Sequence, residues 1–223
     1  MGTVHGRWVI ALTGASGMRY ALRLLDVASQ HLAELHVIIS EAALRVLREE
    51  ENLKISYSNV STELLFGREA RNVFFYNPRD IGAKVASGSA LLDGMVVVPC
   101  SMGTLAAIAN GMSENLVHRA ADVTMKEGRR LVIVPRETPL SAIHLENMLK
   151  LTRFGVRVVP AMPGFYHRPR NLEEVIDMMV MKILDQMGVH IDLVSRWKEA
   201  QQDPAPQRVV LGFKKFSDEE SKG

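Results

Sequence analysis

The sequence has a single cysteine, Cys100, among its 223 residues. One cysteine excludes an internal disulfide and a zinc site built from several cysteines. An excess of charge of one sign is also missing, because 27 Lys and Arg side chains stand against 25 Asp and Glu side chains. Such a balance leaves no strong basic field, so we expect no nucleic acid as a partner.

Long apolar segments are absent as well. No run approaches the roughly 18 apolar residues that a membrane span needs, so we expect no membrane association. The first residues, Met1 to Gly6, have no basic segment leading into an apolar one and no Ser or Thr at the sixth position. A secretory leader and a myristoylation signal are therefore not expected, and we expect a cytoplasmic protein. The seven histidines include no H-E-x-x-H pair, so we expect no metal.

What the chain does have is short apolar runs that alternate with segments of helical periodicity. Runs of this length that are apolar throughout are typical of buried parallel strands, and the alternation predicts an α/β fold. The expected strands are Trp8–Leu12, Leu35–Ile39, Val73–Tyr76, Met95–Val98, Leu131–Val134 and Val156–Val159. The buried stripes expected on the first and last helices are Ala21, Leu24, Leu25 and Ala28, and Leu172, Val175, Ile176, Met179 and Ile183.

The ends of the chain and of its last helix give further expectations. Asn171 and Glu174 have the spacing of a helix cap, and residues 52–67 are expected to hold one short helix between loops. The length fits one domain, which we place at residues 1–197. Residues 198–223 are polar and charged, so we expect a C-terminal tail that is mobile or packed on a neighbouring subunit.

Small and hydroxyl-bearing residues follow three of the expected strands. They are Thr13-Gly14-Ala15-Ser16-Gly17, Ser40, and Pro99-Cys100-Ser101-Met102-Gly103-Thr104. Each alone fits a tight turn or a helix cap, and the first lacks the third glycine of G-x-G-x-x-G. In a doubly wound sheet, however, they form one row of hydroxyls and amides at the carboxyl ends of the strands. That row suits a ligand with one phosphate and a polar ring system, and flavin mononucleotide (FMN) fits this description.

A second group of residues carries positive charge. Arg119 and Lys126 lie seven residues apart in a helical segment and share a face, which by itself fits a solvated helix surface. Arg136 arrives from the next strand, and the three cations predict a phosphate pocket, with Ser87-Gly88-Ser89 as a further source of hydroxyls and amides. Glu137, beside these cations, is a candidate acid or base.

Taken in order, these motifs resemble those of a known family. They are Thr13–Gly17, Ser87–Ser89, Pro99–Leu105, Arg119–Val123, Pro135–Pro139 and Pro163–His167. From about Trp8 to Trp197 the chain resembles the flavin prenyltransferases of the UbiX type, within the flavoprotein superfamily that includes the flavin-dependent cysteine decarboxylases. The resemblance implies a Rossmann-like, flavodoxin-type, doubly wound parallel sheet in three α/β/α layers, and a homododecamer. It also implies an enzyme that attaches a dimethylallyl group to reduced FMN, giving the prenylated FMN that a partner decarboxylase of the UbiD type uses.

The resemblance also implies a role for individual residues. Those expected to hold FMN are Gly14, Ala15, Ser16, Ser40, Ser101, Met102, Gly103, Thr104 and Arg136. Those expected to bind dimethylallyl phosphate are Tyr166, Lys182, Ser87, Gly88, Arg119, Lys126 and Arg136, with Trp197 closing over the site. The expected catalytic residues are Ser16, Glu50, Glu137, Tyr166 and Lys126.

One further absence agrees with this interpretation. Many prenyl-transferring enzymes bind magnesium through a D-D-x-x-D run, which this chain lacks, so a pocket of cations is expected to replace the metal. Two alternatives remain: an FMN-dependent decarboxylase of the cysteine-decarboxylase type and a non-catalytic FMN carrier. The decarboxylases have an Asn-containing motif where this chain has Ser101–Thr104, and a carrier has no need of Glu137.

Overall fold

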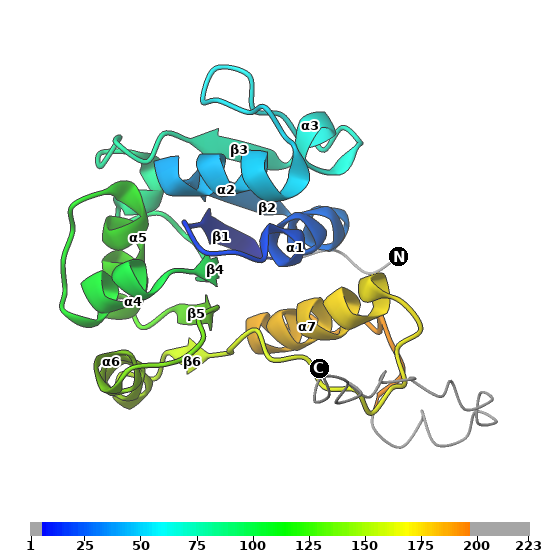
Figure 1. Cartoon of the computed structure of the whole chain (residues 1–223). Coiled ribbons are helices and arrows are strands. Elements are labelled where there is room, and N and C mark those ends of the chain that lie inside the picture. Colours follow the sequence, from blue (N-terminus) through cyan, green and yellow to red (C-terminus); the bar gives the residue numbers. More distant parts are fainter. Residues whose placement is uncertain (1–5, 197–223) are drawn as a thin grey trace, which may run out of the picture.

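The computed structural model of the chain describes residues 6–196, and the expected roles of Trp197 and of the tail 198–223 lie outside this part. The described chain forms one six-stranded sheet in the order β3-β2-β1-β4-β5-β6 (Figure 1). All neighbouring strands are parallel. The strands are β1 (Arg7–Leu12), β2 (Glu34–Ile39), β3 (Val73–Tyr76), β4 (Gly94–Cys100), β5 (Arg130–Pro135) and β6 (Arg157–Val158).

Helices cover both faces of the sheet and give the three layers that the resemblance implies. The helices packed on one face are α1 (Met18–His31), α2 (Glu41–Glu51), α3 (Thr62–Phe66) and α7 (Leu172–Met187). Those packed on the other face are α4 (Met102–Ala109), α5 (Leu116–Lys126) and α6 (Ala142–Arg153), together with the 3-10 helix η1 (Lys84–Ala86).

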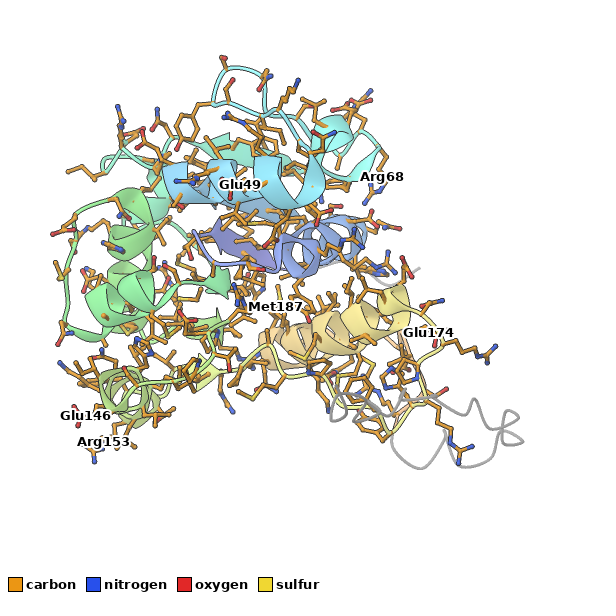
Figure 2. The ribbon with its side chains drawn as sticks, viewed as in Figure 1. Glu49, Arg68, Glu146, Arg153, Glu174 and Met187 are labelled. Carbon is orange, nitrogen blue, oxygen red and sulfur yellow. The ribbon has the colours of Figure 1, made fainter. Side chains whose placement is uncertain are left out.

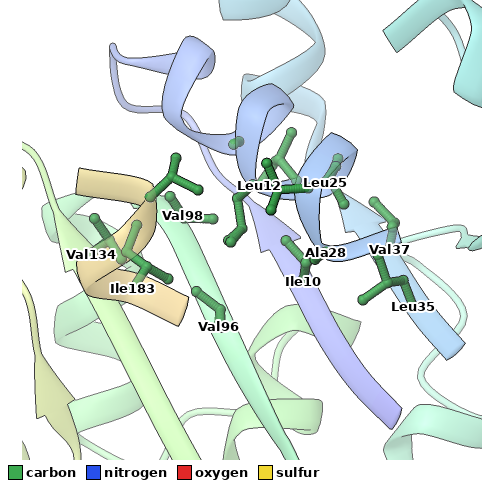
Figure 3. Close-up of a cluster of buried hydrophobic side chains, with 14 of the residues drawn as sticks. Ile10, Leu12, Leu25, Ala28, Leu35, Val37, Val96, Val98, Val134 and Ile183 are labelled. Carbon is green, nitrogen blue, oxygen red and sulfur yellow. The ribbon is translucent and has the colours of Figure 1, made fainter. Parts of the chain in front are cut away.

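The apolar runs are continuous because both faces of the sheet are buried. Along β1, Ile10 and Leu12 join the core beneath α1 and α7, whereas Val9 and Ala11 join the core on the opposite face. Figure 3 shows the first of these cores, in which Ile183 of α7 lies beside the strand residues Val98 and Val134. Each fully buried Val, Leu or Ile contributes roughly 1.5–3 kcal/mol relative to an exposed position. The expected α/β fold is confirmed.

The strand order determines where a ligand can bind. From β1 the chain builds the sheet outward to β2 and β3, and then crosses back to place β4 on the other side of β1. The carboxyl ends of β1 and β4 therefore flank a topological switch point, where loops diverge to opposite faces and leave a crevice. The order is that of a Rossmann sheet, and the three predicted glycine- and hydroxyl-bearing segments follow β1, β2 and β4.

Three local details refine the expectations. Strand β6 is shorter than predicted, at Arg157–Val158. Leu172 is 53% exposed rather than part of the buried stripe, because it occupies the first position of α7, beyond the edge of the core. Asn171 caps α7 as expected, because its side chain accepts from the Glu174 amide at 2.9 Å. In return, the Glu174 carboxylate accepts from the amide of Arg170, the residue before the cap. No helix in residues 6–196 is long and apolar enough to cross a membrane.

Candidate functional site

Thr13 joins the ends of the two central strands. Its hydroxyl donates to the carbonyl oxygen of Pro99 and accepts from the amide of Ser101, both at 2.8 Å. The side chain is 1% exposed, so these bonds are shielded from water. They fix the loop after β1 against the loop after β4. We did not predict this role of Thr13. The only sign of it in the sequence was a threonine at the end of an expected strand.

Two helices begin at this edge of the sheet with a serine cap. Ser40 accepts from the Ala43 amide at 3.1 Å at the start of α2. At the start of α4, Ser101 accepts from the Thr104 amide at 3.3 Å and donates to the Thr104 hydroxyl at 3.0 Å. The amides of the first turn and the positive end of the helix dipole favour an anion at both places.

A cleft of about 470 Å³ opens between these helix starts and α5. This volume is within the range of small-molecule sites. Five of the residues expected to hold FMN line it, namely Gly14, Ser40, Ser101, Gly103 and Thr104. The other lining residues were not predicted and are Ala42, Ala106, Ala107, Asn110, Met112, Glu114, Asn115 and His118.

Glycine is required where the cleft wall is tightest. A Cβ added to Gly14 would overlap the Cβ of Ala42 and lie 3.5 Å from its Cα, so the turn after β1 packs directly on the first turn of α2. A Cβ at Gly103 would meet no atom within 4 Å, which leaves the start of α4 open to the cleft. Hydroxyls, free helix amides and an open glycine fit a ligand with a phosphate, and so they fit FMN.

His118 lines the cleft and was not among the predicted site residues. It is 7% exposed, and burial lowers its pKa while the charge of Glu114 acts in the opposite direction. The side chain is therefore neutral at neutral pH. Asn115 caps the start of α5 by accepting from the His118 amide at 3.0 Å. In the sequence, this asparagine before a helical segment was the signal that could have indicated a helix start near the site.

Glu50 completes the N-terminus of α1 from a neighbouring helix. Gly17, which precedes this helix, has a φ of 103° and no side chain to cap it. The Glu50 carboxylate instead accepts from the amides of Gly17 at 2.9 Å and Met18 at 3.1 Å. Partial burial raises the pKa of Glu50, but hydrogen bonds from Ser16, Met18 and Gly17 and the charge of Arg136 outweigh it, so the pKa is lowered.

Arg136 and Glu137 follow β5 at the same edge of the sheet. The Arg136 Nε donates to the carbonyl oxygen of Ser16 at 3.1 Å, which places the guanidinium beside the turn after β1. Glu137 is exposed and accepts from the amide of Thr138 at 2.9 Å. The structure thus brings Arg136 together with Ser16 and Glu50, three of the residues expected to act in the reaction.

The remaining predicted cations lie on α5. Arg119 pairs with Asp122 at 3.0 Å, and Lys126 pairs with Glu127 at 3.2 Å. The Lys126 Nζ is 3.4 Å from where a Cβ of Gly88 would be, so this lysine lies beside the Ser87–Ser89 loop. Within residues 6–196, no hydrogen bond or ion pair joins this group to Arg136.

Tyr166 lies in the loop before α7, and Lys182 lies on α7 itself. The Tyr166 ring lies 5.7 Å from the His167 ring, edge-on, and Lys182 is exposed on the helix. Figure 1 places α5 and α7 well apart, with the sheet between them. One chain therefore carries the expected phosphate-binding residues in separate groups, Arg119 and Lys126 on α5 and Tyr166 and Lys182 at α7.

A second cavity, of about 520 Å³, lies between α1, α3 and α7. Most of its charged residues are paired with one another, as in the bond from the Arg23 Nε to Asp177 at 2.7 Å. None of its lining residues has a hydroxyl, so the cleft at the switch point, which Ser40, Ser101 and Thr104 line, is the better candidate. No group of three potential metal ligands occurs in the described part of the chain.

The chain is similar to known proteins over most of its length. A family described as Flavoprotein matches residues 3–193. The flavin prenyltransferase UbiX of Halalkalibacterium halodurans is 46% identical over 199 residues, which cover 89% of this chain and 97% of the relative. The enzyme of the same name from Pseudomonas aeruginosa is 44% identical over 197 residues, 86% of this chain and 94% of the relative.

Two solved structures are similar as well. The dodecameric FMN-dependent UbiX-like decarboxylase from Escherichia coli O157:H7 has a TM-score of 0.77 and 41% identity, covering 86% of this chain and 99% of that one. AnUbiX (PadA1), in complex with FMN and dimethylallyl pyrophosphate, has a TM-score of 0.77 and 40% identity, covering 86% and 97%. With its glycine- and hydroxyl-lined cleft at the switch point, the chain belongs to the flavoprotein family and, within it, to the flavin prenyltransferases of the UbiX type.

Proposed function

We propose that the chain is a metal-independent flavin prenyltransferase that joins the dimethylallyl group of dimethylallyl phosphate to N5 and C6 of reduced FMN. The observation that carries this proposal is the cleft at the β1/β4 switch point, where three hydroxyls and the starts of α2 and α4 converge in a chain of this family. Prenylated FMN is the product, and a prenyl-FMN-dependent decarboxylase of the UbiD type is its user.

The residues present fit FMN. Gly14, Ala15, Ser16, Ser40, Ser101, Met102, Gly103, Thr104 and Arg136 hold it, mainly through hydroxyls, main-chain amides and one guanidinium. Bound in its reduced form, FMN supplies the nucleophile of the reaction.

The chain's own side chains handle phosphate and protons. Arg119, Lys126, Arg136 and Lys182 stabilise the charge that develops on the phosphate oxygen as it leaves, assisted by Ser87 and Gly88. Glu137 or Tyr166 supplies a proton at that oxygen. Glu50 accepts from the amides of Gly17 and Met18 at the start of α1 and, with Ser16, holds a proton path beside Arg136.

The site needs more than one copy of the chain. Because α5 and α7 lie apart in one chain, Lys126 and Tyr166 reach one phosphate only when neighbouring subunits face each other. A homo-oligomer, a dodecamer as in the related E. coli structure, supplies this arrangement. We place the enzyme in the cytoplasm and Trp197 over the prenyl side of the site.

The experiment adds the protein, reduced FMN and dimethylallyl phosphate to an apo decarboxylase of the UbiD type under anaerobic conditions. A prenyltransferase gives decarboxylase activity that depends on the prenyl donor. Activity that appears equally without the donor identifies a carrier of FMN instead. Release of CO2 from a cysteine-containing peptide by the protein alone identifies a decarboxylase.

A further inference from the structure

The Ser87–Ser89 loop, which the proposed function assigns to the donor phosphate, projects from the core between two buried alanines. Ala86 and Ala90 are each 7% exposed and join the core beneath α5, whereas Ser87 and Ser89 are exposed. The two serine hydroxyls lie 2.8 Å apart, and the Ser89 amide donates to the Ser87 hydroxyl at 3.3 Å. The loop therefore gathers two hydroxyls and one amide on the same side.

The middle of this loop packs directly on the end of α5, the helix that carries Arg119 and Lys126. A Cβ added to Gly88 would overlap the Glu127 carboxylate, and the Lys126 Nζ is 3.4 Å from that position. A glycine is needed here because the main chain comes this close to the end of the helix. The loop and Lys126 are thus neighbours within one chain.

Arg129, just beyond α5, ties the loop to this helix. Its Nη2 donates to the Gly88 carbonyl oxygen at 2.6 Å, and its amide donates to the Thr124 carbonyl oxygen of α5 at 2.9 Å. Within residues 6–196 the guanidinium forms no ion pair, and its Nη1 is shielded from water without a partner, so the Gly88 carbonyl is its one acceptor. A hydrogen bond from a charged donor is about twice as strong as one between neutral groups.

The same bond determines which way the polar groups of the loop point. The peptide between Gly88 and Ser89 is trans, and in a trans peptide the carbonyl and the amide point in opposite directions. Because the Gly88 carbonyl is turned to Arg129, the Ser89 amide is turned away from it, to the Ser87 hydroxyl. The hydroxyls and the amide are therefore presented on the side of the loop that faces away from Arg129.

We propose that Arg129 is a positioning residue, which holds the Gly88 carbonyl so that Ser87 and Ser89 face the phosphate of the prenyl donor. This inference rests on the proposed function, in which Ser87, Gly88 and Lys126 bind that phosphate. Arg129 itself touches neither donor nor flavin. Because its bond fixes a binding loop and no reacting atom, it governs the affinity for the donor and not the rate at saturating donor.

The test compares Arg129→Met with Arg130→Met in the full-length protein. The two arginines are adjacent and each donates to one main-chain carbonyl, since the Arg130 Nη1 donates to Met187 at 2.8 Å. Met187, labelled in Figure 2, ends α7 on the opposite face of the sheet from α5. Both changes remove one charge and keep an unbranched apolar stem, so they differ in which segment is released.

Four quantities are measured. They are the Kd for dimethylallyl phosphate, by calorimetry on protein that holds oxidised FMN; kcat at saturating donor with reduced FMN; the Kd for FMN; and hydrogen exchange at the amides of residues 87–90, by mass spectrometry. Oxidised FMN lacks the nucleophile of the reaction, so calorimetry reports donor binding whether or not the protein turns over.

For Arg129→Met we expect the donor Kd and the exchange rate of the loop each to rise by about tenfold, the scale of one lost charged hydrogen bond. Both kcat and the Kd for FMN are expected to stay within about threefold. Arg130→Met is expected to change the donor Kd and the loop exchange by less than about threefold, because distant sites act independently. Arg129→Lys, which keeps the charge and a donor, should restore part of both values.

A second comparison separates a held loop from a general effect of charge. The double variant Ser87→Ala, Ser89→Ala removes both hydroxyls and is expected to raise the donor Kd by about tenfold. If Arg129 acts through these hydroxyls, adding Arg129→Met raises the Kd further by less than about threefold, because coupled residues are not additive. A further tenfold rise would show that the charge of Arg129 acts on the phosphate directly, and the inference would be wrong.

An unchanged donor Kd in Arg129→Met would also overturn the inference, and so would an equal effect of Arg130→Met. An FMN affinity that falls together with the donor affinity would show a general structural role instead. If Arg129→Met does not fold, Arg129→Lys is compared with Arg130→Lys through the same four quantities. If the wild type binds the donor but forms no prenylated FMN, the proposed function fails, and the dependence of the donor Kd on Arg129 still decides the inference.

Discussion

Gly14→Ala tests the contact that forms the narrowest wall of the cleft. The added Cβ would overlap the Cβ of Ala42, two residues into α2 from Ser40. Gly14 has a backbone conformation open to any residue, since its φ is not positive, and the expected effect therefore comes from the overlap alone. To relieve it, the first turn of α2 must move away from the turn after β1 and carry Ser40 with it.

Overpacking of this kind costs roughly 1–3 kcal/mol. If all of this free energy is lost from FMN binding, the Kd for FMN rises between about fivefold and about 150-fold. Part of the cost can appear instead as a lower Tm, so both values are measured: the Kd by quenching of flavin fluorescence and the Tm by thermal unfolding.

The matched control removes the other half of the contact. Ala42→Gly alone lowers the Tm by weakening the start of α2, since glycine costs up to about 1 kcal/mol in a helix. In the double variant Gly14→Ala, Ala42→Gly, the overlapping methyl group is gone and the Kd is expected within about twofold of that of Ala42→Gly. Wild-type affinity and Tm in Gly14→Ala would refute the described packing, as would a loss of affinity that the second change does not reduce.

Three more predictions concern charged residues of the site. The pKa of Glu50 is lowered in the folded chain, so its ionised carboxylate stabilises the wild-type fold above about pH 4.3, and this stabilisation is lost as the pH falls further. Glu50→Gln removes the carboxylate and with it this pH dependence. The Tm of the variant is therefore expected to fall less steeply on the acid side, and parallel curves of Tm against pH would contradict the role of Glu50 at α1. Glu137→Gln is expected to keep the Kd for FMN and to slow prenyl transfer by about a hundredfold or more in single-turnover measurements; full turnover at saturating donor would make Glu137 only a counter-ion. Lys126→Ala is expected to raise the KM for dimethylallyl phosphate by about tenfold with little change in FMN affinity, and an unchanged KM would remove Lys126 from the phosphate site.

The sheet was predictable because its strands are buried on both sides. Strands covered by helices on both faces are apolar throughout, so runs such as Met95–Val98 stand out against the helical spacing around them. The position of the cleft was predictable for a related reason. Glycine, serine and threonine after buried strands indicate turns and helix starts at one edge of a parallel sheet, and Ser40 and Ser101 occupy that place.

Contacts between distant residues were not predictable from local patterns. Glu49, Glu50 and Glu51 are adjacent and chemically identical, yet Glu49 pairs with Arg45 and Glu51 with Arg19. Of the three, only Glu50 accepts from the amides at the start of α1, because successive residues of α2 face different directions. The separation of Lys126 from Tyr166 likewise follows from the strand order, which periodicity does not reveal.

Joining a prenyl group to flavin raises the mass of the flavin. The most direct measurement is the mass of the flavin released from the protein after anaerobic incubation with reduced FMN and dimethylallyl phosphate, with EDTA present. We expect FMN heavier by one five-carbon prenyl unit, formed by the wild type and strongly reduced in Glu137→Gln. Release of unmodified FMN only, from wild-type protein saturated with both compounds, would contradict the account.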